Sequence, residues 1–267
     1  MNPMFILFAL ATAVLLFLGS LLALEVGRRI GARHLAAEKD KATAGLSAVE
    51  GAIFGLMGLL LAFTFSSALT GFDLRRQLIV DEANAIATAY TNLDLLPAEA
   101  QSTFRDLFRQ YLSARVDVYR TPRGFSLRRN MTLFAPEPLE RGQRLQAEIW
   151  KEAVANCPPG SSRVACVLLL PAISKMTEVA RIRMAVNQRH PPHIVFAMLF
   201  GIGVTSSLLA GYGMAAKPTR SWVHIVGIAT ALAGALFVIT NIEFPRLGLI
   251  RLDVHDHVLS DIGKLMR

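Results

Sequence analysis

Four long apolar runs divide the sequence, and each has about the length of a membrane-crossing helix. They cover residues 4–24, 51–70, 194–215 and 222–242. A helix rises about 1.5 Å per residue and the hydrocarbon core is about 30 Å thick, so about 20 apolar residues are enough for one crossing. The pattern predicts an all-α integral membrane protein with four transmembrane helices, two on each side of one long insertion.

The second apolar run continues into a charged segment without a helix-breaking residue. No proline occurs between residues 51 and 90, and apolar residues recur at helical spacing beyond the run, at Leu74, Leu78 and Ile86. One helix of about 40 residues would be about 60 Å long, twice the thickness of the hydrocarbon core. We therefore expect one element to cross the membrane and also to begin the extramembrane domain.

The long insertion has the pattern of amphipathic helices. Apolar residues recur three and four positions apart in segments 103–119, 139–157 and 168–189, and no convincing strand alternation occurs. We expect a helical-bundle domain. The expected organisation is transmembrane helices 1 and 2 with a short basic loop (1–72), the helical extramembrane domain (73–192), transmembrane helices 3 and 4 (193–243), and a C-terminal tail that packs on the domain (244–267).

The first apolar run resembles a retained helix more than a signal peptide. No basic residue precedes it, no clear small-x-small cleavage site ends it, and the sequence EVGRR follows directly. We expect it to remain in the membrane.

The basic residues favour one orientation in the membrane. The chain has a formal net charge of +8, and its two short inter-helix loops carry seven basic residues: Arg28, Arg29, Arg33, Lys39, Lys41, Lys217 and Arg220. Short basic loops face the cytoplasm, which would place the inserted domain in the periplasm of a bacterial inner membrane. Four arginines beyond the opposite ends of the spans argue against this orientation: Arg75, Arg76, Arg246 and Arg251.

The only two cysteines lie in the insertion, nine positions apart. Cys157 and Cys166 are separated by a segment containing the turn-forming sequence PPGSS. In a periplasmic domain they would form one disulfide, whereas in a cytosolic domain they would remain two thiols. A single pair is too sparse for a metal site.

The second apolar run combines small residues with hydroxyl groups. Gly51 and Gly55 form a small-xxx-small pattern that permits close helix contact, and Gly58 follows. Its second half carries Thr64, Ser66, Ser67 and Thr70. Either these hydroxyls bond their own helix and the glycines pack a bundle, or the helix lines a conduit in a symmetric oligomer.

Several charged residues are expected near the membrane boundary, where an unpaired charge is costly. They are Arg75, Arg76, Asp81, Glu82 and Glu243. They would form either salt bridges that fix the helices to the domain or a charged vestibule that selects ions. The sequence leaves both interpretations open.

Seven short motifs stand out along the chain: GLLLAFTFS (58–66), DLRR (73–76), DEANAI (81–86), TAY (88–90), LLP (95–97), RQYLSAR (109–115) and PRLGLIR (245–251). In these motifs the chain resembles the bacterial bestrophin-like membrane protein family, which is largely known as a domain of unknown function. The resemblance covers most of the chain, but not residues 120–166.

This resemblance implies a distant analogy to bestrophins, which are pentameric anion channels with the same two-plus-two plan and a phenylalanine-bearing second span. By that analogy the pore-lining candidates are Phe63, Thr64 and Ser67, in a homo-oligomer that conducts small inorganic ions. The hydroxyl pattern of the same run adds Thr70 to these candidates. The acidic calcium-binding run of animal bestrophins is missing, so calcium gating is not implied. One departure is that bestrophin insertions are cytosolic.

Other chemistries are not expected. No zinc-protease, serine-hydrolase or P-loop motif occurs, and acidic residues are interspersed among the arginines, which argues against an enzyme and against nucleic acid. The DVHDH sequence at 253–257 is explained as well by a solvated tail as by a metal site, and we expect neither metal nor cofactor. The leading hypothesis is an ion channel-like membrane protein, and the positive charge balance of the inserted domain favours anions as the permeant ions. The alternative is a non-conducting sensor or scaffold whose helical domain binds a partner.

Overall fold

The computed structural model describes residues 3–37, 46–120, 136–157, 164–216, 222–250 and 252–266. These ranges contain the α-helices α1 (Pro3–Ala37), α2 (Leu46–Thr91), α3 (Ala98–Arg120), α4 (Pro136–Asn156), α5 (Val164–Asn187), α6 (His193–Gly213), α7 (Trp222–Glu243) and α8 (Asp253–Leu265), with short 3-10 turns at Asn92–Leu95 and Met214–Ala216 and no strand. Five of the basic residues discussed above lie outside the described residues: Lys39, Lys41, Lys217, Arg220 and Arg251.

The predicted fold class is confirmed. Four of the described helices, α1, α2, α6 and α7, are long and apolar enough to cross a membrane, and the helices between the two pairs form the expected insertion. α2 is the continuous helix that the sequence predicts. Its 46 residues correspond to a length of about 69 Å at about 1.5 Å per residue.

The chain divides into two compact units, which we describe separately. The membrane unit consists of Met1–Gly71 and Pro191–Ile250, and the helical unit consists of Phe72–His190 and Arg251–Arg267. α2 contributes its first half to the membrane unit and its second half to the helical unit. Residues 244–250, which the sequence analysis assigns to the tail, group with the membrane unit.

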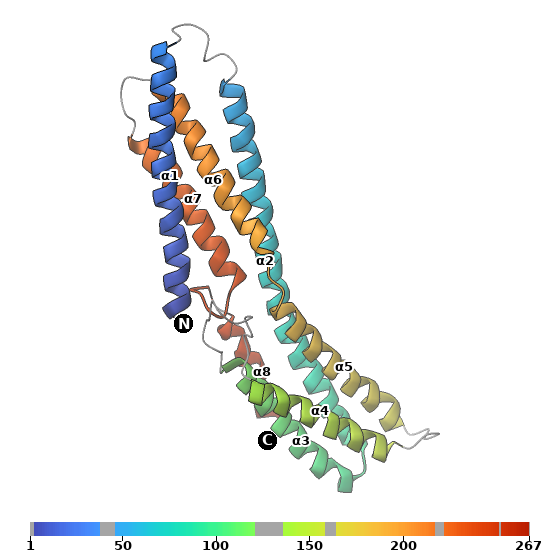
Figure 1. Ribbon diagram of the computed structural model, residues 1–267. Helices are drawn as coiled ribbons and strands as arrows, with labels where there is room; N and C mark the ends of the chain where they lie inside the picture. Colours follow the sequence, from blue (N-terminus) through green and yellow to red (C-terminus); the bar gives the residue numbers. More distant parts are fainter. Residues whose placement is uncertain are drawn as a thin grey trace. The chain divides into compact units, whose positions relative to one another are not determined.

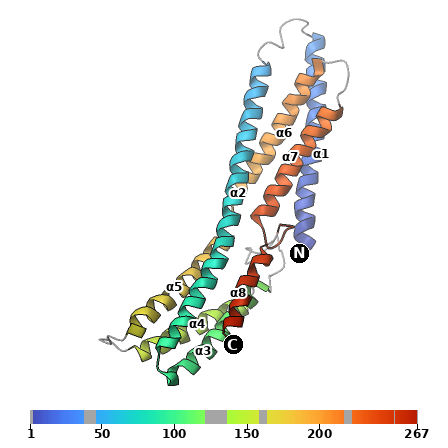
Figure 2. The ribbon, with the colours of Figure 1, turned by 180° about the vertical axis from the view of Figure 1, so that it is seen from behind.

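In the membrane unit, α1 and α6 approach so closely that their backbones touch. Both ribbon views show the two helices side by side (Figures 1 and 2). A Cβ atom added at Gly27 would overlap the carbonyl group of Leu208, and one added at Gly211 would overlap the carbonyl group of Leu24. Small residues at such a crossing allow the close van der Waals contact that holds helices together in lipid.

The Gly211→Ala substitution tests this crossing. The added methyl group has no room against α1, so we expect a loss of stability of about 1–3 kcal/mol, measured by thermal unfolding in detergent. Gly201→Ala, on the same helix, is the matched control, because a Cβ there meets nothing within 4 Å. It should be neutral or stabilising by up to about 1 kcal/mol. Equal effects of the two substitutions would contradict the close crossing.

The turn that follows α7 is held by one asparagine. The Asn241 side chain donates to the carbonyl of Phe237 at 2.8 Å and accepts from the backbone amide of Leu249 at 2.9 Å. A side chain at Gly248 would collide with Asn241. The glycine of the PRLGLIR motif therefore leaves the space that this asparagine needs.

The helical unit has a single large apolar core among its described residues. It is built from the second half of α2 together with α3, α4, α5 and α8, and it includes fully buried side chains such as Ile86, Phe104, Phe108, Ile149 and Ile173. From α8, Leu259, Ile262 and Met266 join this core, and α8 lies against α3 (Figure 2). The last described helix is thus part of the bundle.

Candidate functional site

Among the described residues, the first half of α2 packs in the membrane unit through one face. Met57 and Leu61 contact an apolar cluster formed around Leu16 of α1 and around Leu232 and Leu236 of α7. Further along the same face, Ala68 is buried. This face therefore fixes α2 against its neighbours within one copy of the chain.

A second face of α2 carries most of the predicted pore-lining side chains and is exposed. Phe63 is 66% exposed, and Ser67 and Thr70 are also exposed. Residues three and four positions apart share one side of a helix, so these three residues form a stripe, which we call the Phe63 stripe. Leu56 and Leu59 extend the stripe toward the start of α2 and are likewise exposed.

Thr64, the fourth predicted pore-lining residue, lies on the packed face instead. It is only 7% exposed, and its hydroxyl group donates to the carbonyl of Leu60 at 2.7 Å. Thr70 makes the equivalent bond to the carbonyl of Ser66 at 2.9 Å but remains on the exposed stripe. A hydrogen bond from a hydroxyl group to its own helix therefore occurs on both faces and does not distinguish them. Thr64 differs from the other three predicted pore-lining residues in being buried.

The glycines of α2 lie on a third face of the helix, which is open at these three positions within the described part of the chain. Gly51, Gly55 and Gly58 are exposed or open, and an added Cβ at any of them would meet nothing within 4 Å. The small-xxx-small pattern therefore does not serve the packing of one copy.

The predicted boundary charges fall into two groups. Arg75 and Glu243 are buried, and Arg75 donates to the carbonyl of Arg189 at 2.8 Å. Arg76 is exposed, while Asp81 is partly exposed and accepts a hydrogen bond from Gln77 at 3.0 Å. Only Arg76 and Asp81 retain the access to solvent that a vestibule requires.

Glu82 lies in a buried charge cluster inside the helical unit. Its side chain is fully buried and accepts hydrogen bonds from Arg115 of α3 and from Arg183 of α5, the latter at 2.6 Å. Arg115 also donates to the Tyr119 hydroxyl at 2.9 Å, and the Arg183 guanidinium stacks 3.6 Å from the centroid of the Tyr119 ring. We call these four residues the Glu82 cluster.

The charges of this cluster compensate for its burial. Burial by itself raises the pKa of the Glu82 carboxyl, but the positive charges of Arg115 and Arg183 and their hydrogen bonds hold this pKa below its ordinary value. Next to the cluster, burial raises the pKa of the Tyr111 hydroxyl, which accepts a hydrogen bond from Gln146 at 2.9 Å. The cluster therefore stays ionised at neutral pH. Its geometry favours the salt-bridge interpretation of Glu82 over the vestibule interpretation.

Sequence reasoning missed the partners of Glu82. Arg115 closes the RQYLSAR motif and Arg183 lies within a predicted helix, but both are more than 30 positions away along the chain. Nothing in their spacing to Glu82 indicates a contact. The sequence signal that could have indicated these contacts is an arginine on the otherwise apolar face of α3 and of α5.

Substitution of Glu82 should be severely destabilising. Glu82→Gln removes the carboxylate and leaves two buried guanidinium groups without their counter-charge, which costs about 3–5 kcal/mol. Thermal unfolding of the purified full chain would measure the loss. Asp81→Asn, one position away with a single exposed partner, is the matched control and should change stability by less than about 1 kcal/mol. A mild effect of Glu82→Gln would show that the cluster is not required.

The structure joins Cys157 and Cys166 by a disulfide, with their Cα atoms 5.5 Å apart. It closes the connection between α4 and α5. The described residues contain no group of three or more histidine, cysteine or carboxylate side chains placed to hold a metal ion. The side chains of residues 253–256, in the DVHDH sequence, lie outside that description.

Comparisons with known proteins agree with this architecture. A family model described as a bestrophin-like domain matches residues 14–253. Among solved structures, a point mutant of a bacterial bestrophin homolog from Klebsiella pneumoniae superposes with a TM-score of 0.66 at 14% identity, and a second point mutant with 0.63 at 17%, each covering 96% of this chain and 98% of the other. A crystal structure described as a membrane protein gives 0.66 at 16% identity and covers 97% of both chains. No match was found among curated proteins.

Proposed function

Because the chain belongs to the bestrophin-like family, we propose that it is a homo-oligomeric ion channel in which the α2 helices of several copies surround a shared pathway. The bestrophin homolog structures that it resembles support this through their fold. By analogy with bestrophins, the proposed assembly is a pentamer in a bacterial inner membrane.

The Phe63 stripe is the observation that carries this proposal. Polar side chains within membrane spans usually face a protein interior or a water-filled cavity rather than lipid. Within one copy, Ser67 and Thr70 face neither a protein interior nor a cavity, because they are exposed on the side of α2 away from its packed face. A pathway shared with other copies gives these hydroxyl groups a polar environment, with Phe63 as an apolar constriction beside them.

The open glycine face supplies a contact for the neighbouring copy. Gly51, Gly55 and Gly58 have room for another helix at close range, and small residues at such spacing favour helix association in lipid. The packed face, the glycine face and the Phe63 stripe thus have different roles in the proposed oligomer.

Of the site residues predicted from the sequence, we keep those whose side chains are exposed or partly exposed. The proposed pore-lining residues are Phe63, Ser67 and Thr70, and Thr64 is left out because it is buried within one copy. The proposed vestibule charges are Arg76 and Asp81, whereas Arg75, Glu82 and Glu243 are buried. The chain has 28 lysine and arginine residues against 20 acidic residues, and this positive balance supports small inorganic anions as the permeant ions.

Phe63→Ala tests the constriction. Removing the ring widens the proposed pathway, so anion flux through liposomes containing the purified oligomer should rise several-fold while thermal stability changes little. Phe65→Ala is the matched control. Phe65 is 41% exposed, but two positions along a helix turn a side chain by about 200°. Equal changes in flux for both variants, or no flux from the wild-type oligomer, would contradict the proposal.

A second candidate function is supported by exposed apolar side chains near the disulfide. Trp150, Val154 and Val167 are each more than two-fifths exposed on α4 and α5. Such side chains favour a non-conducting sensor or scaffold that binds a partner through the helical unit. A purified oligomer without any conductance would favour this function over the channel.

For orientation, we propose that the helical unit faces the periplasm, supported by the basic short loops and the disulfide. A C-terminal alkaline phosphatase fusion should be active in cells, and a C-terminal cytoplasmic fluorescent reporter should be dark. The same reporters inserted after residue 40, in the short basic loop, provide the control and should give the opposite pattern. Cytoplasmic fluorescence at the C-terminus would reverse the proposed orientation.

A further inference from the structure

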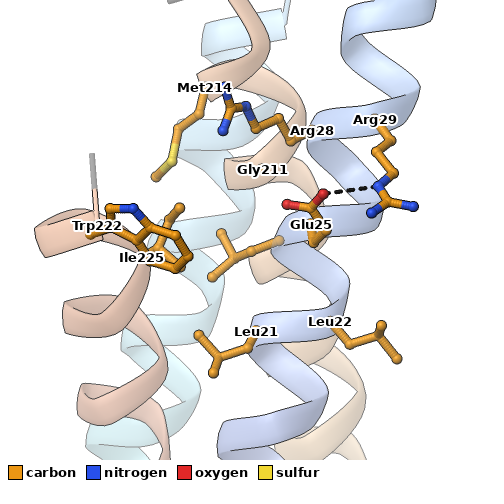
Figure 3. A pocket seen from close by; sticks show the side chains of 10 residues that line it. Leu21, Leu22, Glu25, Arg28, Arg29, Gly211, Met214, Trp222 and Ile225 are labelled. Carbon is orange, nitrogen blue, oxygen red and sulfur yellow. Dashed lines mark hydrogen bonds and ion pairs between the residues drawn. The ribbon is translucent and has the colours of Figure 1, made fainter. Parts of the chain in front are cut away.

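The membrane unit contains a pocket between the end of α1 and the start of α7, which we call the α1–α7 pocket. Its volume is about 470 Å³, and its apolar wall includes Leu21, Leu22, Trp222 and Ile225 (Figure 3). Gly211 of α6 and Met214, in the 3-10 turn that follows α6, also line the pocket. This volume lies within the range of about 300–1,000 Å³ that is common for small-molecule sites.

One cation of this pocket lacks a partner in the described part of the chain. The Nη1 atom of Arg28 is buried and makes no hydrogen bond there. Arg29, the next residue, pairs with Glu25 at 2.8 Å and is largely exposed. Figure 3 shows the carboxylate of Glu25 turned toward Arg29, whereas the guanidinium group of Arg28 extends toward Met214. The two arginines and one glutamate leave a net charge of +1 at the pocket.

The position of the pocket along the helices indicates which class of ligand it can bind. It lies where α1 changes from an apolar to a basic sequence and where α7 begins at an exposed tryptophan. Basic and aromatic side chains gather at the level of the lipid headgroups. The Arg28 side chain is only partly buried, but its charged Nη1 atom is buried without a hydrogen bond, which is costly. A ligand with an anionic group next to an apolar tail would complement both this charge and the apolar wall.

We propose that the α1–α7 pocket binds one anionic phospholipid, with its phosphate on Arg28 and an acyl chain against Leu21, Leu22 and Ile225. The charge of Arg28 complements the phosphate, and basic pockets between membrane helices bind anionic headgroups. This site is separate from the Phe63 stripe, and its occupancy does not depend on whether the protein conducts ions.

Native mass spectrometry of the purified full chain tests the proposal, with phosphatidylglycerol, phosphatidylcholine or inorganic phosphate added in turn. Phosphatidylglycerol should be retained and should raise the melting temperature more than phosphatidylcholine does. Arg28→Gln should weaken phosphatidylglycerol retention about tenfold, as expected for loss of a charge-assisted hydrogen bond, and Arg28→Lys should keep most of it. Arg33→Gln is the matched control, because Arg33 is exposed on the same helix and does not line the pocket.

Three results would overturn the proposal. If Arg28→Gln and Arg33→Gln lowered phosphatidylglycerol retention equally, the lipid would be held by general surface charge and not by Arg28. If phosphatidylglycerol and phosphatidylcholine were retained equally, the pocket would not select an anionic headgroup. Inorganic phosphate that displaces the lipid at equal concentration would identify a free-anion site instead. The melting temperature of each variant without added lipid separates loss of lipid binding from loss of folding. Ile225→Trp places a larger side chain in the apolar part of the pocket, so it should also reduce phosphatidylglycerol retention while the protein stays folded.

Discussion

α2 has to remain one unbroken helix while its surroundings change along its length. Its first half belongs to the membrane unit and its second half to the helical unit. One side of the helix is buried in both halves, at Ala68 and then at Ile79 and Ile86, whereas Phe63 and Thr88 on the opposite side are exposed. A helix of 46 residues can keep one side packed throughout only if its apolar spacing stays near 3.6 residues per turn.

The Glu82 cluster gives the packed side of α2 its specificity in the helical unit. A buried ion pair adds little net stability compared with apolar packing, but an unpaired buried charge is strongly destabilising. Glu82 on α2 has Arg115 on α3 and Arg183 on α5 as partners, with the Tyr119 ring stacked on Arg183. Any arrangement of these three helices that separated the charges would be penalised, so we infer that the cluster selects one register among apolar alternatives.

The sequence was sufficient for properties that depend on local pattern. Run lengths and helical spacing predict the four spans, the continuous α2 and the helical insertion, because membrane thickness and helix periodicity are fixed. Contacts between distant segments could not be predicted in this way. The Gly27 and Gly211 crossing and the partners of Glu82 depend on which helices become neighbours, and a single sequence does not contain that information. The α2 residues show the same limit: Thr64 and Ser67 have similar chemistry, but only the packing of α1, α6 and α7 shows that one is buried and the other exposed.

The proposed channel depends on where the exposed side of α2 lies when several copies assemble. An experimental structure of the purified full chain in lipid nanodiscs would measure this directly. The account predicts a ring of copies with Phe63, Ser67 and Thr70 of every α2 facing the central axis, and with the glycine face at Gly51, Gly55 and Gly58 against the neighbouring copy. A monomer, or an oligomer in which the Phe63 stripe faces lipid, would contradict it.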